Sequence, residues 1–598
     1  MSDEPGGKIG SEAQEFSKNL MRVAEQSQAL VRQFLEQQQG ATNTHLDPLN
    51  IGGAFLDMTQ KMMANPQKVM EAHMALWQDY LRLWQHAAER MLGQDSEPVA
   101  VPEADDRRFR DAAWEENQIF DFIKQSYLLT ARWLQNTVSE VEGLDEKTAK
   151  KVDFYTRQFV DAMAPTNFLL TNPTVLKATL EEKGENLVRG LDNMLQDLER
   201  GKGRLAIRMT DMDAFKVGEN IAVTPGKVIW QTDLMQLIQY APSTDKVRER
   251  PLLIIPPWIN KYYILDLKPG NSFIAWAVAQ GLTVFVISWV NPDAELAHKS
   301  FEDYLHEGVL AALEGIEAAT GEAEINAIGY CLGGTLLAAT LGYMKATGDE
   351  RIKSATFFAS LVDFSEPGEL EVFIDEEQIR HLEQRMKEAG GYLDGSAMAT
   401  TFNMLRANDL IWSFVVNNYL LGKEPFPFDL LYWNSDSTRM PAEMHSFYLR
   451  NMYQKNLLAQ PSGITLSDQP IDLHRIDLPV YILSTREDHI APWKGTYKAT
   501  QIYAGPISFT LAGSGHIAGV VNPPSSGKYG YETGGELLAD PDAWQATAAK
   551  HEGSWWPHWL KWLTRLAGPK VPARTPGAGK AKAIEDAPGR YVQVRADD

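Results

Sequence analysis

The stretch EINAIGYCLGGTLLAAT, residues 324–340, decides the fold of this 598-residue chain. It holds the chain's single cysteine, Cys331, between glycines. A β-branched apolar run precedes the cysteine, and a run of helical composition follows it. Residues 329–333 therefore have the form G-x-C-x-G of a nucleophile elbow, a sharp strand-to-helix turn that exposes its central side chain. The glycines permit the turn and the close approach of strand and helix.

The position of Cys331 suits a nucleophile. The N-terminus of the helix that follows favours a thiolate over a thiol, because the helix dipole places partial positive charge there. The alternative is a small buried thiol that packs as an apolar residue. The strand before the motif and the helix after it favour the nucleophile.

A nucleophile elbow requires an acid and then a histidine later in the chain, each placed just after a strand. Residues 478–485, LPVYILST, form a strand-like run that Asp488 follows closely. Residues 507–515, ISFTLAGSG, form the next such run, and His516 comes directly after it. The order Cys331, Asp488, His516 is the order of the α/β-hydrolase fold.

Each of the two partners has a rival. Glu487 is the alternative to Asp488, which could also be an ordinary turn or salt-bridge carboxylate. His489 is the alternative to His516, but a histidine directly beside the acid is poorly placed to hydrogen-bond it and still reach Cys331. We therefore predict Asp488 as the acid and His516 as the base.

An oxyanion hole is expected to combine the backbone N–H of Leu332 with an N–H from the loop after an early strand. Residues 252–258, LLIIPPW, are the source of that loop, because the strand-like run ends at two prolines. Pro257 has no N–H, so the second donor is Trp258 or Ile259. The alternative is a turn that only terminates the strand.

The pattern of apolar residues is expected to divide the chain into regions. Residues 1–100 form a variable helical N-terminal region, and residues 101–209 form a helical N-terminal domain. In residues 210–567, strand-like runs alternate with helical stretches, the pattern of a mostly parallel sheet covered by helices. Residues 361–472 interrupt this catalytic domain as a cap insertion, and residues 568–598 form a flexible Pro/Gly-rich tail. The strand-like runs are PLLIIPPW, LTVFVISWV, EINAIGY, SATFFAS, LPVYILST and ISFTLAGSG. The predicted fold class is α/β: an α/β-hydrolase fold with a cap insertion, preceded by a helical N-terminal region.

The composition excludes several kinds of partner and site. A formal net charge of -22 argues against nucleic acid or an anionic membrane as the main partner. A single cysteine excludes internal disulfides and cysteine-rich metal sites. The polar, acidic N-terminus has neither the basic start nor the apolar run of a signal peptide. Gly281 interrupts the longest apolar passage, residues 273–290, so we expect a buried helix and a buried strand there, and no membrane span.

One apolar stripe stands out in the N-terminal region. Its members follow one another at alternating steps of four and three residues, the spacing of one helix face. The stripe is interpreted as a helix-bundle core or an interface, or as an adaptable Met-rich surface for an apolar partner. This apolar stripe consists of Met70, Met74, Trp77, Leu81, Trp84, Ala88 and Met91.

Several longer blocks between about residues 105 and 567 resemble the class I polyhydroxyalkanoate synthases, and they occur in the same order. The blocks are PPWINKYYILDL, SWVNPD, GYCLGGT, FPFDLLYWNSDSTRMP, STREDHIAPW, GSGHIAGVVNPP and HEGSWWPHW. The first hundred residues and the tail carry little of the resemblance. The total length favours the class I type, which works without a partner subunit.

The resemblance implies a function and a set of residue roles. Cys331 would be the acylated nucleophile, His516 the general base and Asp488 the third catalytic member. The substrates would be (R)-3-hydroxyacyl-CoA, with short 3-hydroxybutyryl units, and the growing polyester chain. The resemblance also implies a homodimer in the cytoplasm, on the surface of polyester granules, with granule-coating proteins as candidate partners.

A cysteine suits this reaction, because a thiolate that attacks a thioester forms another thioester and keeps its reactivity. A free cysteine thiol is mostly protonated near pH 7, so a base must take its proton. In elongation, either His516 assisted by Asp488 or Asp488 more directly would activate the 3-hydroxyl. Aromatic residues of the cap insertion could keep the pocket dry against hydrolysis, and the candidates are Trp412, Tyr432 and Trp433. No phosphate-cradling glycine loop or metal cluster occurs in the sequence, so coenzyme A is expected as a substrate and no cofactor is implied.

Two alternative functions share part of this evidence. A thioesterase of the α/β-hydrolase fold would use the same three residues and release free acid in place of polymer. A non-catalytic, granule-associated protein would use the apolar stripe and the tail. The complete and correctly ordered set of Cys331, Asp488 and His516 argues against the second alternative.

Overall fold

The computed structural model describes residues 14–19, 21–23, 25, 51–104 and 106–595. These residues form two compact units. One unit contains the described residues up to Asp211 together with Phe402–Phe426, and the other contains residues 212–401 and 427–595. The division after Asp211 lies two residues beyond the predicted start of the catalytic domain. The middle of the predicted cap insertion groups with the N-terminal unit, which sequence patterns do not reveal.

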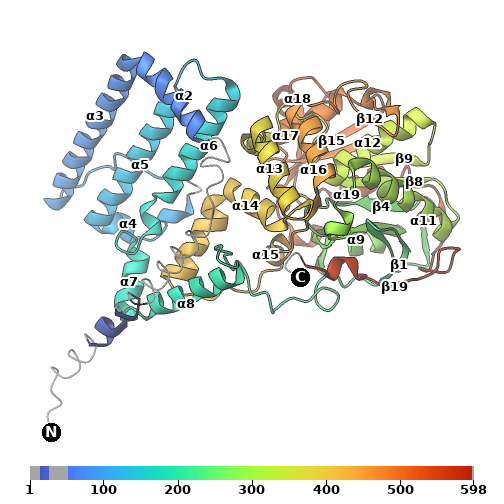
Figure 1. Cartoon of the computed structure of the whole chain (residues 1–598), viewed down its shortest axis with the longest axis horizontal. Helices are drawn as coiled ribbons and strands as arrows, with labels where there is room; N and C mark the ends of the chain where they lie inside the picture. The colour runs from blue at the N-terminus through green and yellow to red at the C-terminus, as the bar shows by residue number, and fades with distance from the viewer. Residues whose placement is uncertain (1–13, 20, 24, 26–50, 105, 596–598) are drawn as a thin grey trace, which may run out of the picture. The chain divides into compact units, whose positions relative to one another are not determined.

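Eleven strands of the described chain form one sheet in the larger unit (Figure 1). Its six central strands are parallel to one another, and antiparallel strands extend both edges. The six central strands coincide with the six strand-like runs of the sequence, so the prediction of a mostly parallel sheet is confirmed. In spatial order the strands are β17 (Ala549–His551), β16 (Tyr531–Thr533), β15 (Ile507–Ala512), β14 (Val480–Thr485), β9 (Ile352–Phe358), β8 (Ile325–Tyr330), β4 (Leu252–Ile255), β7 (Val284–Trp289), β2 (Met235–Tyr240), β1 (Gly226–Gln231) and β19 (Glu585–Asp586).

Helices cover both faces of this sheet. Successive strand residues point to opposite sides, and the apolar residues on each side pack under helices. In β4, Leu253 and Ile255 join one buried apolar cluster, and Leu252 and Ile254 join another. The first cluster packs under α11 (Ala311–Thr320) and α12 (Leu332–Thr347). The second packs under α9 (Phe273–Ala279) and α19 (Trp556–Leu563). Strands that are apolar on both sides are therefore buried on both sides, as parallel strands usually are.

The longest apolar passage of the chain is a helix followed by a strand. It forms α9 and β7, and Gly281 between them has a φ of 78°, a left-handed conformation that favours glycine. The prediction for residues 273–290 is confirmed. None of the helices in the described ranges combines the length and the apolar character needed to cross a membrane.

The segment between β9 and β14 contains the predicted cap insertion. Short helices dominate it, and several contain π-helical turns. Its helices are α13 (Glu376–Glu388), α14 (Gly395–Leu405), α15 (Asp429–Ser435), α16 (Ala442–Tyr448) and the π-helices η7 (Asn408–Trp412), η8 (Val415–Leu420) and η9 (Leu449–Gln454).

The C-terminal tail differs from the expectation of a flexible segment. Its strand β18 (Lys570–Pro572) pairs with β3 (Lys246–Arg248), and β19 pairs with β1 at the edge of the main sheet. Ala581 and Val592 are buried. The Pro/Gly-rich composition is compatible with this order, because edge strands and a few apolar anchors replace the long apolar runs that sequence patterns detect.

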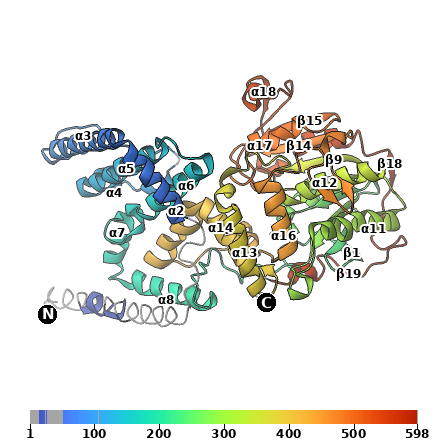
Figure 2. The same cartoon turned by 45° about the horizontal axis from the view of Figure 1, so that its top comes forward.

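The N-terminal unit is built from helices, as predicted, and α3 packs along α5 (Figure 1, Figure 2). Its π-helix η8 packs against α8. The principal helices are α2 (Ile51–Ala64), α3 (Pro66–Met91), α5 (Gln118–Ser139), α6 (Glu146–Ala162), α7 (Pro173–Glu181) and α8 (Glu185–Arg200).

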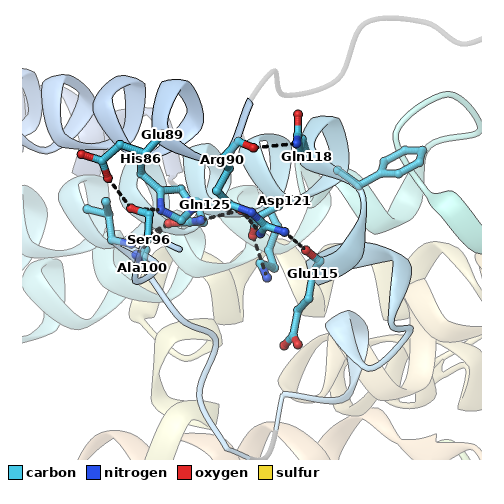
Figure 3. Close-up of polar contacts among 12 residues, drawn as sticks. His86, Glu89, Arg90, Ser96, Ala100, Glu115, Gln118, Asp121 and Gln125 are labelled. Carbon is cyan, nitrogen blue, oxygen red and sulfur yellow. Dashed lines mark hydrogen bonds and ion pairs between the residues drawn. The ribbon is translucent and has the colours of Figure 1, made fainter. Parts of the chain in front are cut away.

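A buried carboxylate fastens α3 to α5 (Figure 3). Oδ2 of Asp121 accepts hydrogen bonds from Arg90 at 3.1 Å and Gln125 at 3.0 Å, and His86 Nε2 lies 3.1 Å from it. Lys124 forms an ion pair with Asp121 at 3.2 Å. A buried charge with this many partners is compensated in place, but it would be costly without them. The polar face of α3 is therefore the one that packs inward at this point.

The apolar stripe lies on the other face of α3. All seven of its members are exposed, and the large ones are 57% to 70% exposed. The interpretation as a helix-bundle core is wrong, since the buried residues of α3 are Leu83 and His86. The stripe stays a candidate interface.

Candidate active site

Cys331 occupies the strand-to-helix turn that its sequence predicts. It follows β8 directly and is the N-cap residue of α12, with φ 52° and ψ -122°. This left-handed φ is unusual for a residue with a side chain and is typical of strained functional turns. The side chain is partly exposed at the end of the sheet.

Two glycines make the turn possible by allowing close approach. A Cβ added at Gly329 would lie 2.4 Å from Cα of Gly334, and one added at Gly333 would lie 2.1 Å from the carbonyl oxygen of Ile255. Both contacts are with backbone atoms, so neither can be relieved by a side-chain movement. The predicted roles of the glycines in the motif are confirmed.

His516 and Asp488 meet beside this turn. Nδ1 of His516 lies 2.7 Å from Oδ2 of Asp488. The Asp488 carboxylate is also held by the backbone N–H groups of Ile490 at 2.9 Å and Ala491 at 2.8 Å, and by the hydroxyl of Thr485 at 3.0 Å. A carboxylate with four donors has a fixed orientation, and it fixes the imidazole in turn.

His516 interacts electrostatically with Cys331 as well as with Asp488. Burial alone would lower the pKa of His516, but the charges of Asp488 and Cys331, and the hydrogen bond to Asp488, raise it to about 10. Because Nδ1 faces Asp488, Nε2 is the nitrogen left for Cys331. The structure thus brings the three predicted residues together, with His516 between Cys331 and Asp488.

The rival residues are placed differently. Asp488 is 7% exposed, whereas the neighbouring Glu487 is fully on the surface. Burial raises the pKa of Asp488, but the charge of His516, its hydrogen bond and two backbone N–H groups lower it below its ordinary value. His516 holds the hydrogen bond to Asp488 that the sequence assigns to the base.

The predicted oxyanion residues lie on two segments that touch. Gly333 packs against the carbonyl oxygens of Ile255 and Pro256, so the N-terminus of α12 lies against the loop after β4. Leu332 is the first residue of α12, where backbone N–H groups lack helical partners. Within the described ranges, the N–H groups of Leu332 and of the two predicted loop residues, Trp258 and Ile259, donate to no other protein group.

The family model for the N-terminus of poly-beta-hydroxybutyrate polymerase (PhaC) matches residues 105–277, and that for the alpha/beta hydrolase fold matches residues 255–523. The predicted fold class is therefore confirmed. A poly(3-hydroxyalkanoate) polymerase of Methylorubrum extorquens is 52% identical over 540 residues, which cover 90% of this chain and 89% of that protein. The chain belongs to the poly(3-hydroxyalkanoate) polymerase family.

Other members of this polymerase family are nearly as similar. The PhaC subunit of Rhizobium meliloti (strain 1021) is 49% identical over 98% of this chain and 96% of its own length. The PhaC subunit of Cupriavidus necator is 42% identical over 93% of each chain. The resemblance drawn from sequence blocks is confirmed, and the similarity also extends into the N-terminal region, where those blocks gave little signal.

Sequence patterns missed several residues around the site of this family member. Tyr330 donates a hydrogen bond to the carbonyl oxygen of His516 at 3.0 Å. Tyr448 and Tyr453 come from α16 and η9, and burial together with the charge of Cys331 raises the pKa of each phenol. Tyr448 and Tyr453 lie more than a hundred residues along the chain from Cys331, so no local motif marks them.

The aromatic residues predicted to dry the pocket have separate locations. Trp412 belongs to the segment that groups with the N-terminal unit. Tyr432 and Trp433 belong to the catalytic unit and are buried. Trp433 donates a hydrogen bond to the carbonyl oxygen of Lys261 at 2.7 Å, so it supports the loop after β4.

Proposed function

We propose that the protein polymerises (R)-3-hydroxyacyl-CoA, with 3-hydroxybutyryl-CoA as the expected unit, and releases coenzyme A through an acyl group bound to Cys331. The observation that carries this proposal is the placement of Cys331, at a nucleophile elbow, beside the hydrogen-bonded pair of His516 and Asp488, in a member of the poly(3-hydroxyalkanoate) polymerase family.

In the acylation step, His516 takes the proton of Cys331, and the thiolate attacks the thioester carbonyl. The backbone N–H of Leu332 and that of Trp258 or Ile259 stabilise the oxyanion, each by about 2.7–4 kcal/mol if it acts as such donors usually do. The bond to sulfur of coenzyme A breaks, and that sulfur leaves with the proton held by His516. One thioester has replaced another, so the step is nearly balanced in energy.

In the elongation step, a 3-hydroxyl attacks the acyl-enzyme, the new ester bond forms and the Cys331 sulfur is released. We assign the activation of this hydroxyl to His516. Asp488 is poorly suited to act as the base, because four donors already occupy its oxygens and its pKa lies below the ordinary value. Asp488 then orients the imidazole of His516 and stabilises its protonated form.

A thioesterase remains the second candidate, because the same three residues would also catalyse hydrolysis. Mixing the purified protein with (R)-3-hydroxybutyryl-CoA separates the two. Coenzyme A release with rising turbidity, both absent in Cys331→Ala, is the expected result. Release with one equivalent of free acid and no turbidity would make the protein a thioesterase, and no release from wild type would remove both proposals.

The resemblance also leads us to propose a cytoplasmic homodimer at the surface of polyester granules, with granule-coating proteins as neighbours. The exposed apolar stripe of α3 supports an apolar neighbour of this kind. A non-catalytic granule protein would need the stripe but not a strained Cys331 beside His516 and Asp488.

A further inference from the structure

Lys261 is a buried cation close to the predicted oxyanion loop. Its Nζ lies 3.0 Å from Oδ1 of Asp436, and the two side chains are 3% and 1% exposed. It also donates hydrogen bonds to the carbonyl oxygens of Val592 at 2.7 Å and Val594 at 2.6 Å. Two of the three protons of the ammonium thus go to backbone carbonyls, and the Asp436 carboxylate supplies the counter-charge. The cation therefore joins the loop after β4, a segment of the cap insertion and the C-terminal tail.

The segment of the cap insertion that contains Asp436 also hydrogen-bonds the predicted oxyanion loop, the loop after β4. The N–H of Thr438 donates to the carbonyl oxygen of Ile259 at 2.8 Å, and the Thr438 hydroxyl donates to that of Trp258. Asp436, two residues earlier, accepts a hydrogen bond from Tyr263 at 2.7 Å in addition to its ion pair. The carbonyls of Trp258 and Ile259 are thus anchored. Because the Trp258 carbonyl belongs to the same peptide group as the Ile259 N–H, this anchor sets the direction of that N–H.

The tail reaches Lys261 as an ordered segment. Tyr591 donates its hydroxyl to the carbonyl oxygen of Thr232 at 2.9 Å, and its N–H bonds the side chain of Gln236 at 3.2 Å. Val592 is 1% exposed. The carbonyls of Val592 and Val594, which face Lys261, therefore follow a residue that is hydrogen-bonded to Thr232 and Gln236 near the edge of the sheet.

We propose that Lys261 is a positioning residue for the oxyanion hole and that the tail, through the carbonyls of Val592 and Val594, is part of the same device. This inference rests on the proposed function, because it concerns the acylation step. Without Lys261, the buried Asp436 carboxylate loses its cation, and the segment that grips the loop loses its anchor. The loop N–H then no longer points to where the oxyanion forms.

The test compares two reactions of the single cysteine. Acyl transfer from (R)-3-hydroxybutyryl-CoA passes through an oxyanion, whereas alkylation by iodoacetamide does not. In Lys261→Met we expect the rate of first-turnover coenzyme A release and kcat to fall by about 10²-fold, the order of loss of one oxyanion donor, with KM little changed. The alkylation rate of Cys331 should stay at the wild-type value.

Lys227→Met is the matched control, because Lys227 forms an exposed ion pair with Asp586 of the same tail. It should leave both reactions unchanged. A chain truncated after Tyr591 should reproduce the Lys261→Met pattern, and adding Lys261→Met to it should cause little further loss, since both changes disable one device. Lys261→Arg, which keeps the charge, should recover part of the acylation rate.

Two results would overturn the proposal. One is an unchanged rate of coenzyme A release in Lys261→Met. The other is a parallel fall in the alkylation rate, which would mean that Lys261 supports the whole site or the fold. If Lys261→Met does not fold and Lys261→Arg behaves as wild type in both reactions, the conclusion is the same. A wild-type protein that is alkylated but releases no coenzyme A would instead overturn the proposed function, and this inference with it.

Discussion

Nδ1 of His516 lies 2.7 Å from Oδ2 of Asp488, in a place where the carboxylate is fully buried. The pair comes from the loops after two adjacent parallel strands, β14 and β15, and Cys331 follows β8 in the same sheet. The carboxyl ends of parallel strands meet at one edge, so three residues spread over 186 positions converge there. This convergence gives the proposed acid, base and nucleophile their arrangement.

Asp488→Asn should slow coenzyme A release by about 10²–10⁴-fold, the usual contribution of general acid–base catalysis. The charge of Asp488 raises the pKa of His516, so its removal leaves less imidazolium to support the thiolate. Iodoacetamide alkylation of Cys331 at pH 7 should slow as well, since the thiolate is the nucleophile. Asp477→Asn, which changes an exposed ion pair with Lys345, is the control. Equal alkylation rates in wild type and Asp488→Asn would contradict this role.

The pH dependence of stability provides a second prediction. The pKa of His516 is about 10, above its ordinary 6.5, so the stability it contributes is fully present below about pH 6.5 and is lost as the pH rises through about 10. The difference in unfolding free energy between wild type and His516→Gln should therefore shrink between pH 7 and pH 10. Denaturant unfolding at several pH values measures it. A difference in unfolding free energy that grows between pH 7 and pH 10 would contradict the raised pKa of His516.

Gly333→Ala should damage both fold and site. The new Cβ would meet the carbonyl oxygen of Ile255 at 2.1 Å, and overpacking of this kind costs about 1–3 kcal/mol or more. The helix–loop contact that carries Leu332 would open, so acylation should slow beyond the loss of folded protein. Gly270→Ala, where no atom lies within 4 Å, should leave stability and acylation as they are. A stable, fully active Gly333→Ala would contradict the close approach described for the elbow.

Asp121→Ala should destabilise the N-terminal unit by about 3–5 kcal/mol, because buried cations lose their counter-charge. Arg90, Lys124 and His86 all face this carboxylate. Limited proteolysis should cut α3 and α5 sooner, while alkylation of Cys331, in the other unit, keeps its rate. Glu181→Ala, which removes an exposed carboxylate near Lys177, serves as the comparison. Unchanged proteolysis would mean that the polar cluster contributes little.

The sequence predicts those parts of the molecule that depend on local patterns. Residues 324–340 predict the elbow because the patterns of the strand, the turn and the start of the helix all fall within these 17 positions. Asp488 and His516 follow from strand ends in a known order. The anchoring of the loop after β4 could not be predicted in this way, since Lys261 meets Val592 across 331 positions of sequence. Composition also misjudged the tail, where Ala581 and Val592 are buried among polar and Pro/Gly-rich neighbours.

The N-terminal unit shows the same limit from another side. The spacing of the apolar stripe correctly predicts one helix face, but periodicity does not say whether that face points inward. His86 and Arg90 decide this, because their partner Asp121 lies on α5. A buried polar cluster overrides the usual expectation that the apolar face of a helix packs.

The acyl-enzyme itself is the most direct test of the account. Intact-protein mass spectrometry after brief mixing with (R)-3-hydroxybutyryl-CoA should show added 3-hydroxybutyryl units on wild type and none on Cys331→Ala. Because the chain has a single cysteine, peptide mapping can assign the thioester without ambiguity. Coenzyme A release from wild type with no acyl group on Cys331, or acylation that persists in Cys331→Ala, would contradict the mechanism.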